Sequence, residues 1–316
     1  MTQRAYDPEL VDMVKALPTN MDWSDMDRAR AELSNLIPPA SDEDVAALGV
    51  RCEDRSIPGP DGAPDVPIRI YTPTDGDGVR PGVLYIHGGG FCLGTLDGEQ
   101  LGAAGAAKAA DAVVVSVDYR LAPEHPFPAG VEDCFAALVW TATEAKALGI
   151  DPGHIGVMGQ SAGGGLAAAV ALLARDRGGP ALCFQCLGIP ELDDRLETAS
   201  MREFVDTPLW NRPNAEVSWR YYLGDAPGEV SPYAAPARAE DLSGLPAAYV
   251  STMEFDPLRD EGILYALRLL EHGVPVELHQ FPGTFHGSSV VAAAEVSKRS
   301  TEEMMGALRR GLRRNA

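Results

Sequence analysis

The stretch Gly159-Gln160-Ser161-Ala162-Gly163 is the strongest indication of the fold class of this chain, together with the apolar run before it and the alanine-rich run after it. Residues 154–158 predict a strand, and residues 162–175 predict a helix that begins directly after Ser161. A serine in a sharp strand-to-helix turn, with glycines two residues away on each side, is typical of a nucleophile elbow. The glycines let strand and helix pack closely, and the helix N-terminus points toward the serine oxygen. Ser161 is therefore the candidate nucleophile; the alternative is a glycine-rich turn with a capping serine.

Strand-like and helical segments alternate on both sides of this stretch, with glycine, proline and aspartate at the turns. Such alternation indicates a mainly parallel sheet with helices on both faces. Shorter β-rich runs such as 67–71 precede it. The predicted strands are 82–86, 112–117, 154–158, 182–189, 247–252 and 274–281. The predicted helices are 101–110, 131–147, 162–175, 258–270 and 290–310.

Two segments depart from this alternation. The first 45 residues predict two amphipathic helices, 8–17 and 23–36, separated by Pro18. The stretch at about 192–225 interrupts the alternation and carries the aromatic residues Trp210, Trp219, Tyr221 and Tyr222. We expect residues 1–45 and this insertion to form a small helical cap on an α/β domain that spans residues 46–316. The alternative is a pair of surface helices that never meets a ligand.

A second glycine-rich motif, His87-Gly88-Gly89-Gly90, follows the predicted strand 82–86. Acyl transfer builds negative charge on a carbonyl oxygen, and backbone N–H groups must already point at that oxygen. Glycine lets a loop approach closely enough to supply them. Gly88 and Gly89 are therefore the predicted oxyanion-hole donors, with the amide of Ala162 as the third. The alternative is a flexible glycine turn.

A nucleophilic serine needs a base, and the sequence offers six histidines. His286 is favoured because it lies in a turn after the last predicted strand, and functional residues of parallel sheets gather at the carboxyl ends of strands. His279 lies within that strand and His272 near the end of a helix, where packing or solvent-facing roles are more common. An imidazole that titrates near neutral pH can take the serine proton and return it to a leaving group.

The imidazole in turn needs a carboxylate to orient it. Asp256 follows the predicted strand 247–252 and completes the chain order Ser, Asp, His that this kind of site uses. Glu254 is the second choice. Asp260 and Glu261 fall in the first turn of the next helix, where acidic residues usually interact with the helix dipole.

Four blocks in order resemble the bacterial hormone-sensitive lipase family of esterases, over about residues 81–287. They are His87-Gly88-Gly89-Gly90-Phe91, the run 118–129 (DYRLAPEHPFPA), Gly159 to Gly164, and Asp256 to Glu261, followed by His286-Gly287. The resemblance implies the α/β-hydrolase fold: a mostly parallel eight-stranded sheet, helices on both faces, and a cap from the N-terminal helices and an insertion after the sixth strand. It also implies hydrolysis of short- to medium-chain esters with no cofactor. Many members dimerise, so a homodimer is expected.

One residue departs from the family pattern. Members usually have aspartate before the serine, and this chain has Gln160. Loss of that carboxylate should alter hydrogen bonding beside the elbow and the pH profile, while the reaction class stays the same. Gln160 and Phe91, which follows the glycine motif, are the predicted substrate contacts.

The charge composition argues against two classes of binding partner. The net charge of -20 and the pI of about 4.6 disfavour nucleic acid and anionic membrane surfaces. No apolar run follows the first residues, so we expect no signal peptide and a cytoplasmic protein with free thiols.

Cys183 and Cys186 form a C-x-x-C in a strand-like run, where residues three apart point to opposite faces. Core packing is therefore expected of them, and no metal or cofactor site.

The leading hypothesis is thus a carboxylesterase that acts through an acyl-enzyme on Ser161. Two other classes stay open. One is a non-catalytic receptor for small ligands, because the plant gibberellin receptors resemble this family and have lost the histidine; His286 argues against this class. The other is a different acyl-transfer reaction, such as hydrolysis of amides or lactones, which the three residues alone do not distinguish.

Overall fold

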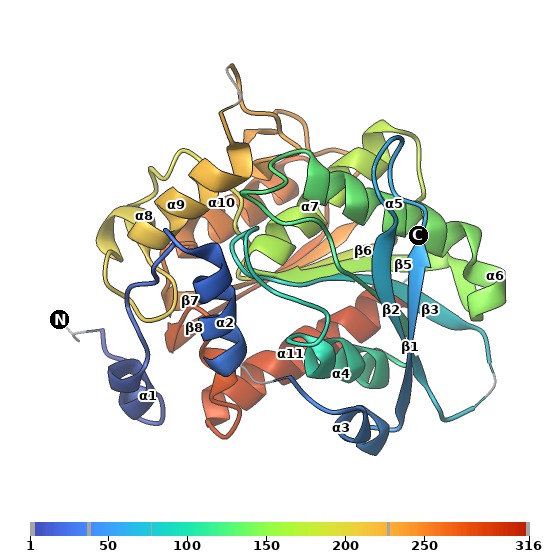
Figure 1. The fold of residues 1–316 in the computed structure, drawn as a ribbon, viewed down its shortest axis with the longest axis horizontal. Helices are drawn as coiled ribbons and strands as arrows, with labels where there is room; N and C mark the ends of the chain where they lie inside the picture. Colours follow the sequence, from blue (N-terminus) through green and yellow to red (C-terminus); the bar gives the residue numbers. More distant parts are fainter. Residues whose placement is uncertain (1–3, 37–38, 77, 226–227, 314–316) are drawn as a thin grey trace.

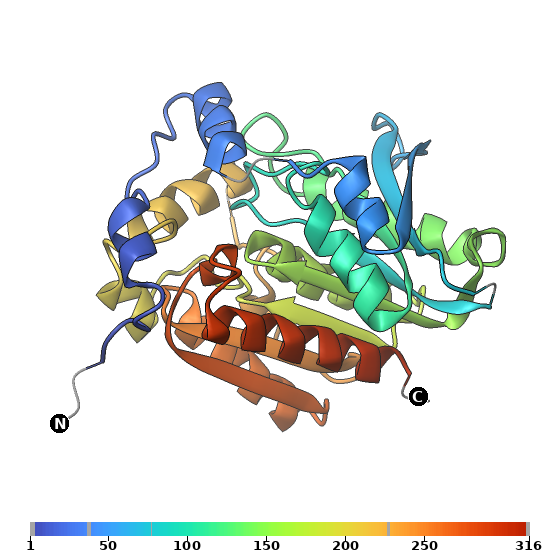
Figure 2. The same ribbon diagram turned by 90° about the horizontal axis from the view of Figure 1, so that it is seen from below.

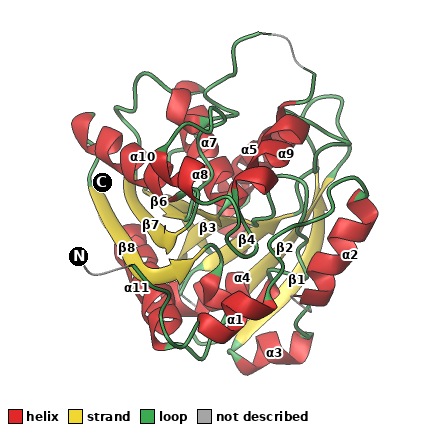
Figure 3. Cartoon of the chain, turned by 90° about the vertical axis from the view of Figure 1, so that its left-hand side faces the viewer, coloured by secondary structure: helices red, strands yellow, loops and turns green. Residues whose placement is uncertain are grey.

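The computed structural model describes residues 4–36, 39–76, 78–225 and 228–313. Its strands form one sheet in the order β1-β2-β4-β3-β5-β6-β7-β8. Figure 3 shows the strands crossing the molecule from β8 at one edge to β1 at the other. Their bounds are Val50–Ile57 (β1), Val66–Pro73 (β2), Arg80–Ile86 (β3), Val113–Val117 (β4), Ile150–Gln160 (β5), Phe184–Gly188 (β6), Ala247–Phe255 (β7) and Val276–Phe285 (β8).

The direction of the strands determines where a site can form. β2 runs antiparallel to both of its neighbours, and the pairs from β4 to β8 are parallel. From β3 the chain continues to β4 on one side, and then returns past β3 to β5 on the other. The carboxyl ends of β3 and β5 therefore flank a topological switch point, which is where α/β sheets bind ligands.

Helices cover both faces of the sheet, as Figure 1 shows. α4 (Gln100–Ala110) and α11 (Glu295–Leu312) pack against each other on one face. α5 (Ala129–Thr143), α7 (Ala162–Asp176) and α10 (Arg259–Glu271) lie on the opposite face. A large apolar cluster fills the space on each side of the sheet. The predicted layer arrangement is confirmed. In the ranges that the structure describes, no helix has the length and apolarity to cross a bilayer.

The two segments expected to form a cap lie side by side, as Figure 2 shows. The N-terminal segment holds α1 (Val11–Ala16) and α2 (Met26–Leu36), and the insertion holds α8 (Ala199–Glu203) and α9 (Arg212–Leu223). The Trp23 indole Nε1 donates to Asn214 over 2.9 Å, and the Tyr221 hydroxyl donates to the Trp23 carbonyl over 2.9 Å.

The boundary predicted at residue 45 falls inside a third helix, α3 (Asp42–Ala47). The Ser41 side chain caps this helix through a capping box with Asp44. Because α3 packs on β1 and α4, it lies with the sheet and not with the N-terminal helices.

The two cysteines of the C-x-x-C differ from expectation. Cys183 precedes β6, so the alternation of a strand does not govern its side chain, and both residues pack toward the same apolar cluster. The predicted divergence onto opposite faces is therefore wrong. Both thiols are free, and burial raises the pKa of the Cys183 thiol to about 11. Core packing, the expected role, describes Cys186, which is buried, whereas Cys183 is partly buried at the edge of the cluster.

Candidate active site

Ser161 is the single residue between the end of β5 and the start of α7, and its backbone angles are φ 56° and ψ -126°. Residues other than glycine rarely adopt such angles, and surrounding contacts must hold them. Here the Ser161 N–H donates to the Gly188 carbonyl over 2.9 Å, and the Ser161 carbonyl accepts from Gly165 and Glu191 over 3.0 Å each. The turn predicted from the sequence is therefore present and fixed on both sides.

The glycines on either side of Ser161 are required by close backbone approach. A Cβ at Gly159 would lie 2.1 Å from the carbonyl oxygen of Gly163. A Cβ at Gly163 would in turn lie 2.2 Å from the carbonyl oxygen of Ile86, the last residue of β3. Any side chain at either position would push β3, β5 and α7 apart.

The structure brings Ser161, His286 and Asp256 together in one hydrogen-bonded line. The His286 Nε2 lies 2.9 Å from the Ser161 Oγ, and its Nδ1 lies 2.8 Å from Asp256 Oδ2. The Leu258 N–H donates to Asp256 Oδ1 over 2.9 Å, which fixes the carboxylate. Asp256 is 0% exposed and His286 is 7% exposed. Each of the three residues follows the carboxyl end of a different parallel strand.

The residues that the sequence left as alternatives are engaged elsewhere. Backbone N–H groups of other segments donate to the carboxylates of Glu254, Asp260 and Glu261. His279 lies 2.9 Å from a glutamate on α11, and His272 lies 3.2 Å from an aspartate. None of the five contacts the Ser161–His286 pair through a hydrogen bond in the described part of the chain.

The predicted oxyanion-hole donors lie beside the serine. A Cβ at Gly88 would lie 3.5 Å from the Ser161 Cβ, so this loop runs directly past the nucleophile. Among the loop and cap hydrogen bonds of the described residues, none is donated to a backbone carbonyl by the N–H of Gly88, Gly89 or Ala162. Ala162 is the first residue of α7, and its N–H is one of the donors that a helix leaves unpaired at its N-terminus. These three amides are thus available for a negatively charged oxygen.

His87 supports the glycine loop, a role that the sequence did not reveal. Its ring is buried and stacks on Tyr119 with centroids 4.3 Å apart, and its Nδ1 lies 2.8 Å from the Gly88 carbonyl. The Tyr119 hydroxyl donates to the His87 carbonyl over 3.0 Å. Burial lowers the pKa of His87 to about 4, so the ring is neutral at pH 7 and its Nδ1–H donates to Gly88. Tyr119 belongs to the 118–129 block, which was the available signal.

This buried imidazole should make the fold sensitive to acid. In the unfolded chain the His87 imidazole becomes protonated near pH 6.5, and in the folded protein it becomes protonated only near pH 4. From pH 7 to pH 4.5, His87 should therefore lower the free energy of unfolding by about 2–3 kcal/mol. Urea unfolding at both pH values checks this, because His87→Asn should lose that part of the decrease. An equal decrease in both proteins would contradict the prediction.

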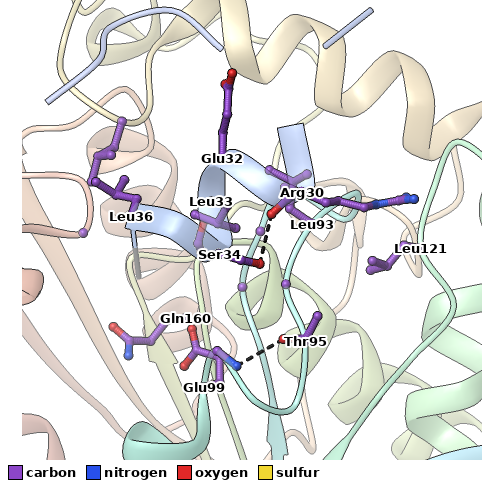
Figure 4. Close-up of a pocket in the computed structure, with 18 of the residues that line it drawn as sticks. Arg30, Glu32, Leu33, Ser34, Leu36, Leu93, Thr95, Glu99, Leu121 and Gln160 are labelled. Carbon is purple, nitrogen blue, oxygen red and sulfur yellow. Dashed lines mark hydrogen bonds between the residues drawn. The ribbon is translucent and has the colours of Figure 1, made fainter. Parts of the chain in front are cut away.

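A pocket of about 1280 Å³ opens over Ser161 and His286. Gln160, one of the two predicted substrate contacts, lines this pocket, and so do Gly88 and Gly89. Figure 4 shows α2 lying over Gln160 and Glu99. The apolar lining includes Leu33, Leu36, Leu93, Leu121, Ile189 and Trp210.

Phe91, the other predicted substrate contact, does not line this pocket. Its φ of 59° turns the side chain into the core, where it is 2% exposed. The ring stacks on Tyr222 of α9 with centroids 4.0 Å apart, and Trp219 packs on it at 5.2 Å. Phe91 therefore joins the glycine loop to α9.

A second buried link between α9 and the glycine loop is polar. The Ser218 hydroxyl of α9 donates to the Gly90 carbonyl over 2.8 Å and lies 3.5 Å from Glu191 Oε1. Glu191 is 0% exposed, and burial raises the pKa of its carboxyl well above the usual range. Since its N–H donates to the Ser161 carbonyl, Glu191 contacts both the turn at Ser161 and, through Ser218, the insertion at about 192–225. Sequence analysis missed Glu191 because a lone glutamate carries no signal of burial.

Comparison with known proteins identifies the protein family of this chain. A family model described as the alpha/beta hydrolase fold matches residues 83–289. Carboxylesterase NlhH of Mycobacterium tuberculosis is 42% identical over 319 residues, which cover 97% of this chain and 96% of that protein. The chain belongs to the α/β-hydrolase family. Both the predicted fold class and the predicted resemblance to esterases are confirmed.

Solved structures agree with this assignment. One named "Bacterial Heroin Esterase" superposes with a TM-score of 0.92 at 53% identity and covers 98% of this chain and 99% of that chain. Esterase LipW from Mycobacterium marinum superposes with a TM-score of 0.89 at 38% identity, over 98% of this chain and 96% of that chain. The enzyme class predicted from the sequence, a carboxylic ester hydrolase, is the class named for these relatives.

Proposed function

We propose that this chain hydrolyses short- to medium-chain carboxylic esters through an acyl-enzyme on Ser161. The observation that carries the proposal is the hydrogen-bonded line from Ser161 Oγ through His286 to Asp256, with steps of 2.9 and 2.8 Å. A hydroxyl becomes a nucleophile only when a positioned base takes its proton, and the base must itself be oriented. This line also favours an enzyme over a non-catalytic receptor on the same fold.

In the first half of the reaction, Ser161 Oγ attacks the ester carbonyl as its proton passes to His286 Nε2. Negative charge then develops on the carbonyl oxygen, and the amides of Gly88, Gly89 and Ala162 stabilise it. His286 gives the proton to the alcohol oxygen, the C–O bond breaks, and the acyl group stays on Ser161 as an ester. Buried Asp256 keeps the imidazole in the tautomer with hydrogen on Nδ1 and stabilises the imidazolium.

In the second half, water attacks the acyl-enzyme with His286 as base, and the same three amides stabilise the second tetrahedral intermediate. The Ser161 oxygen leaves with a proton from His286, and the carboxylic acid departs. No step requires a cofactor or a metal.

The cap sets which esters fit. We propose that the N-terminal helices and the insertion at about 192–225 form this cap, with the boundary before α3. Leu33 and Leu36 of α2 and Trp210 of the insertion all line the pocket. An apolar pocket of about 1280 Å³ suits acyl chains of short and medium length.

Two measurements test the proposal together. A panel of p-nitrophenyl esters from acetate to palmitate should give the highest kcat/KM at short or medium chains, and lower values at palmitate. A fluorophosphonate probe should add its mass to the peptide that contains Ser161, and this labelling should stop the hydrolysis. Hydrolysis that continues in the fully labelled protein would reject the acyl-enzyme on Ser161.

We further propose a cytoplasmic location and a homodimer. The five cysteines are free, which suits a reducing compartment. The dimer rests on the resemblance to a family in which many members dimerise. Light scattering after size exclusion tests it directly.

A further inference from the structure

The catalytic pocket contains a carboxylate that the proposed reaction does not use. Glu99 lies directly before α4, lines the pocket, and accepts a hydrogen bond from the Tyr85 hydroxyl over 2.8 Å. Figure 4 shows its carboxyl group beside Gln160, the residue that precedes Ser161.

Most charged side chains around the pocket already have an ion-pair partner. The pairs, with N···O distances of 2.7 to 2.8 Å, are Arg30–Glu124, Arg120–Asp133, Asp97–Arg69 and Glu32–Arg28. Glu99 and Asp118 are the lining carboxylates that have no ion-pair partner within the described ranges. Both lining arginines are thus already paired, and the Glu99 carboxyl group beside Gln160 faces the pocket without an arginine or lysine partner in the described ranges.

Glu99 is held in place and incompletely solvated. The Tyr85 ring is buried beneath it, and the Tyr85 hydroxyl fixes one carboxylate oxygen. Burial raises the pKa of Glu99, which means that the surroundings stabilise its negative charge poorly. A ligand cation in the pocket would supply the missing counter-charge, and the apolar lining would hold the rest of such a ligand.

We propose that Glu99 is a specificity-determining residue that favours esters with a positively charged amine or quaternary ammonium group. This inference rests on the proposed function and adds the substrate class. The reaction is unchanged: the cation binds beside Gln160 while Ser161 attacks the ester carbonyl. Charge complementarity of this kind acts on the affinity for the charged substrate and leaves the chemistry of bond cleavage unaffected.

A pair of substrates with the same shape tests the proposal. Butyrylcholine carries a trimethylammonium group, and 3,3-dimethylbutyl butyrate has carbon in place of that nitrogen. The value of kcat/KM for each, measured by pH-stat at pH 8, gives a cation-to-neutral ratio. Glu99→Gln keeps the size of the side chain and can still accept from Tyr85. We expect this variant to lower the ratio about tenfold, through the charged ester alone.

The matched control is Glu302→Gln, which removes one exposed carboxylate of α11 outside the pocket lining. It should leave the ratio unchanged, so that an effect of net charge is separated from an effect of the pocket. The conservative variant Glu99→Asp should recover most of the ratio. An unchanged ratio in Glu99→Gln, or an equal loss for both esters, would overturn the proposal.

The neutral ester separates this inference from the proposed function. If wild-type protein hydrolyses 3,3-dimethylbutyl butyrate and Glu99→Gln does not change the ratio, only the role of Glu99 is wrong. If wild-type protein hydrolyses neither this ester nor p-nitrophenyl butyrate, the esterase function itself is wrong.

Discussion

Replacing Ser161 with alanine is expected to lower kcat for p-nitrophenyl butyrate about 10⁵- to 10⁶-fold, with little change in KM. The variant loses the only oxygen that lies 2.9 Å from His286 Nε2 among the described contacts, so no acyl-enzyme can form. The pocket and the amides of the oxyanion hole remain, and they leave a small residual acceleration. Stopped assays at high enzyme concentration can measure the remaining rate.

The combination of Ser161→Ala with His286→Ala gives the sharper test. Residues that act as one unit lose activity non-additively, so the double variant should be about as slow as either single variant. Losses that multiply would mean that the two residues act independently, and this would contradict the shared proton transfer. Circular dichroism and urea unfolding should show that all three variants fold.

The second large effect is expected for Gly163→Ala. A Cβ at this position would lie 2.2 Å from the Ile86 carbonyl oxygen and 2.5 Å from that of His87, and backbone atoms cannot rotate away. Relief of this clash must move the loop that carries Gly88 away from Ser161. We expect the free energy of unfolding to fall by about 2–4 kcal/mol. We also expect kcat to fall roughly 10²- to 10³-fold, as when an oxyanion-hole donor is lost.

Gly105 on α4 provides the matched control. A Cβ there meets no heavy atom within 4 Å, so Gly105→Ala should stabilise the helix by about 0.5–1 kcal/mol and leave kcat unchanged. Chemical denaturation and ester assays of both variants check the pair. If Gly163→Ala kept full activity, the close approach of α7 to the end of β3 would not be needed for catalysis.

The parts of the site that were predictable are those determined by neighbours in sequence. The glycines around Ser161 show the need for close packing within five residues, and the strand ends place His286 and Asp256 on the same edge of the sheet. Asp256 was preferred and Glu254 was the second choice; the structure places Asp256 directly after β7 and Glu254 within that strand. The alternation of segments was sufficient to predict the layers of the sheet, because each strand is a short apolar run between turns.

The boundaries of elements were less predictable where tertiary contacts extend or divide a segment. β8 continues to Phe285 because Phe255 of β7 pairs with it beyond an irregularity in the register, although Pro282 and Gly283 suggest a turn. The predicted helix 131–147 is divided into α5 and a short α6 (Ala145–Leu148), and α11 begins at Glu295 instead of Val290.

The direction of side chains was also not predictable. Phe91 follows the glycine motif and was expected in the pocket, but its backbone angle turns it toward α9. Glu99 and Glu191 are far from Ser161 in sequence, and nothing in their local pattern shows that one reaches the pocket and the other is buried beside the elbow. Such positions depend on how distant segments pack, and a single sequence does not contain that information.

Two buried contacts join α9 to the glycine loop, which forms one wall of the pocket. A swing of α9 would pull on the Gly90 carbonyl through Ser218 and on the ring of Phe91 through Tyr222, and would thus misalign the groups that stabilise charge. Leu33 and Leu36 take part in neither contact. Combinatorial libraries for altered substrate range should therefore vary these two residues, because enlarging the pocket from α2 does not disturb the contacts that position the glycine loop.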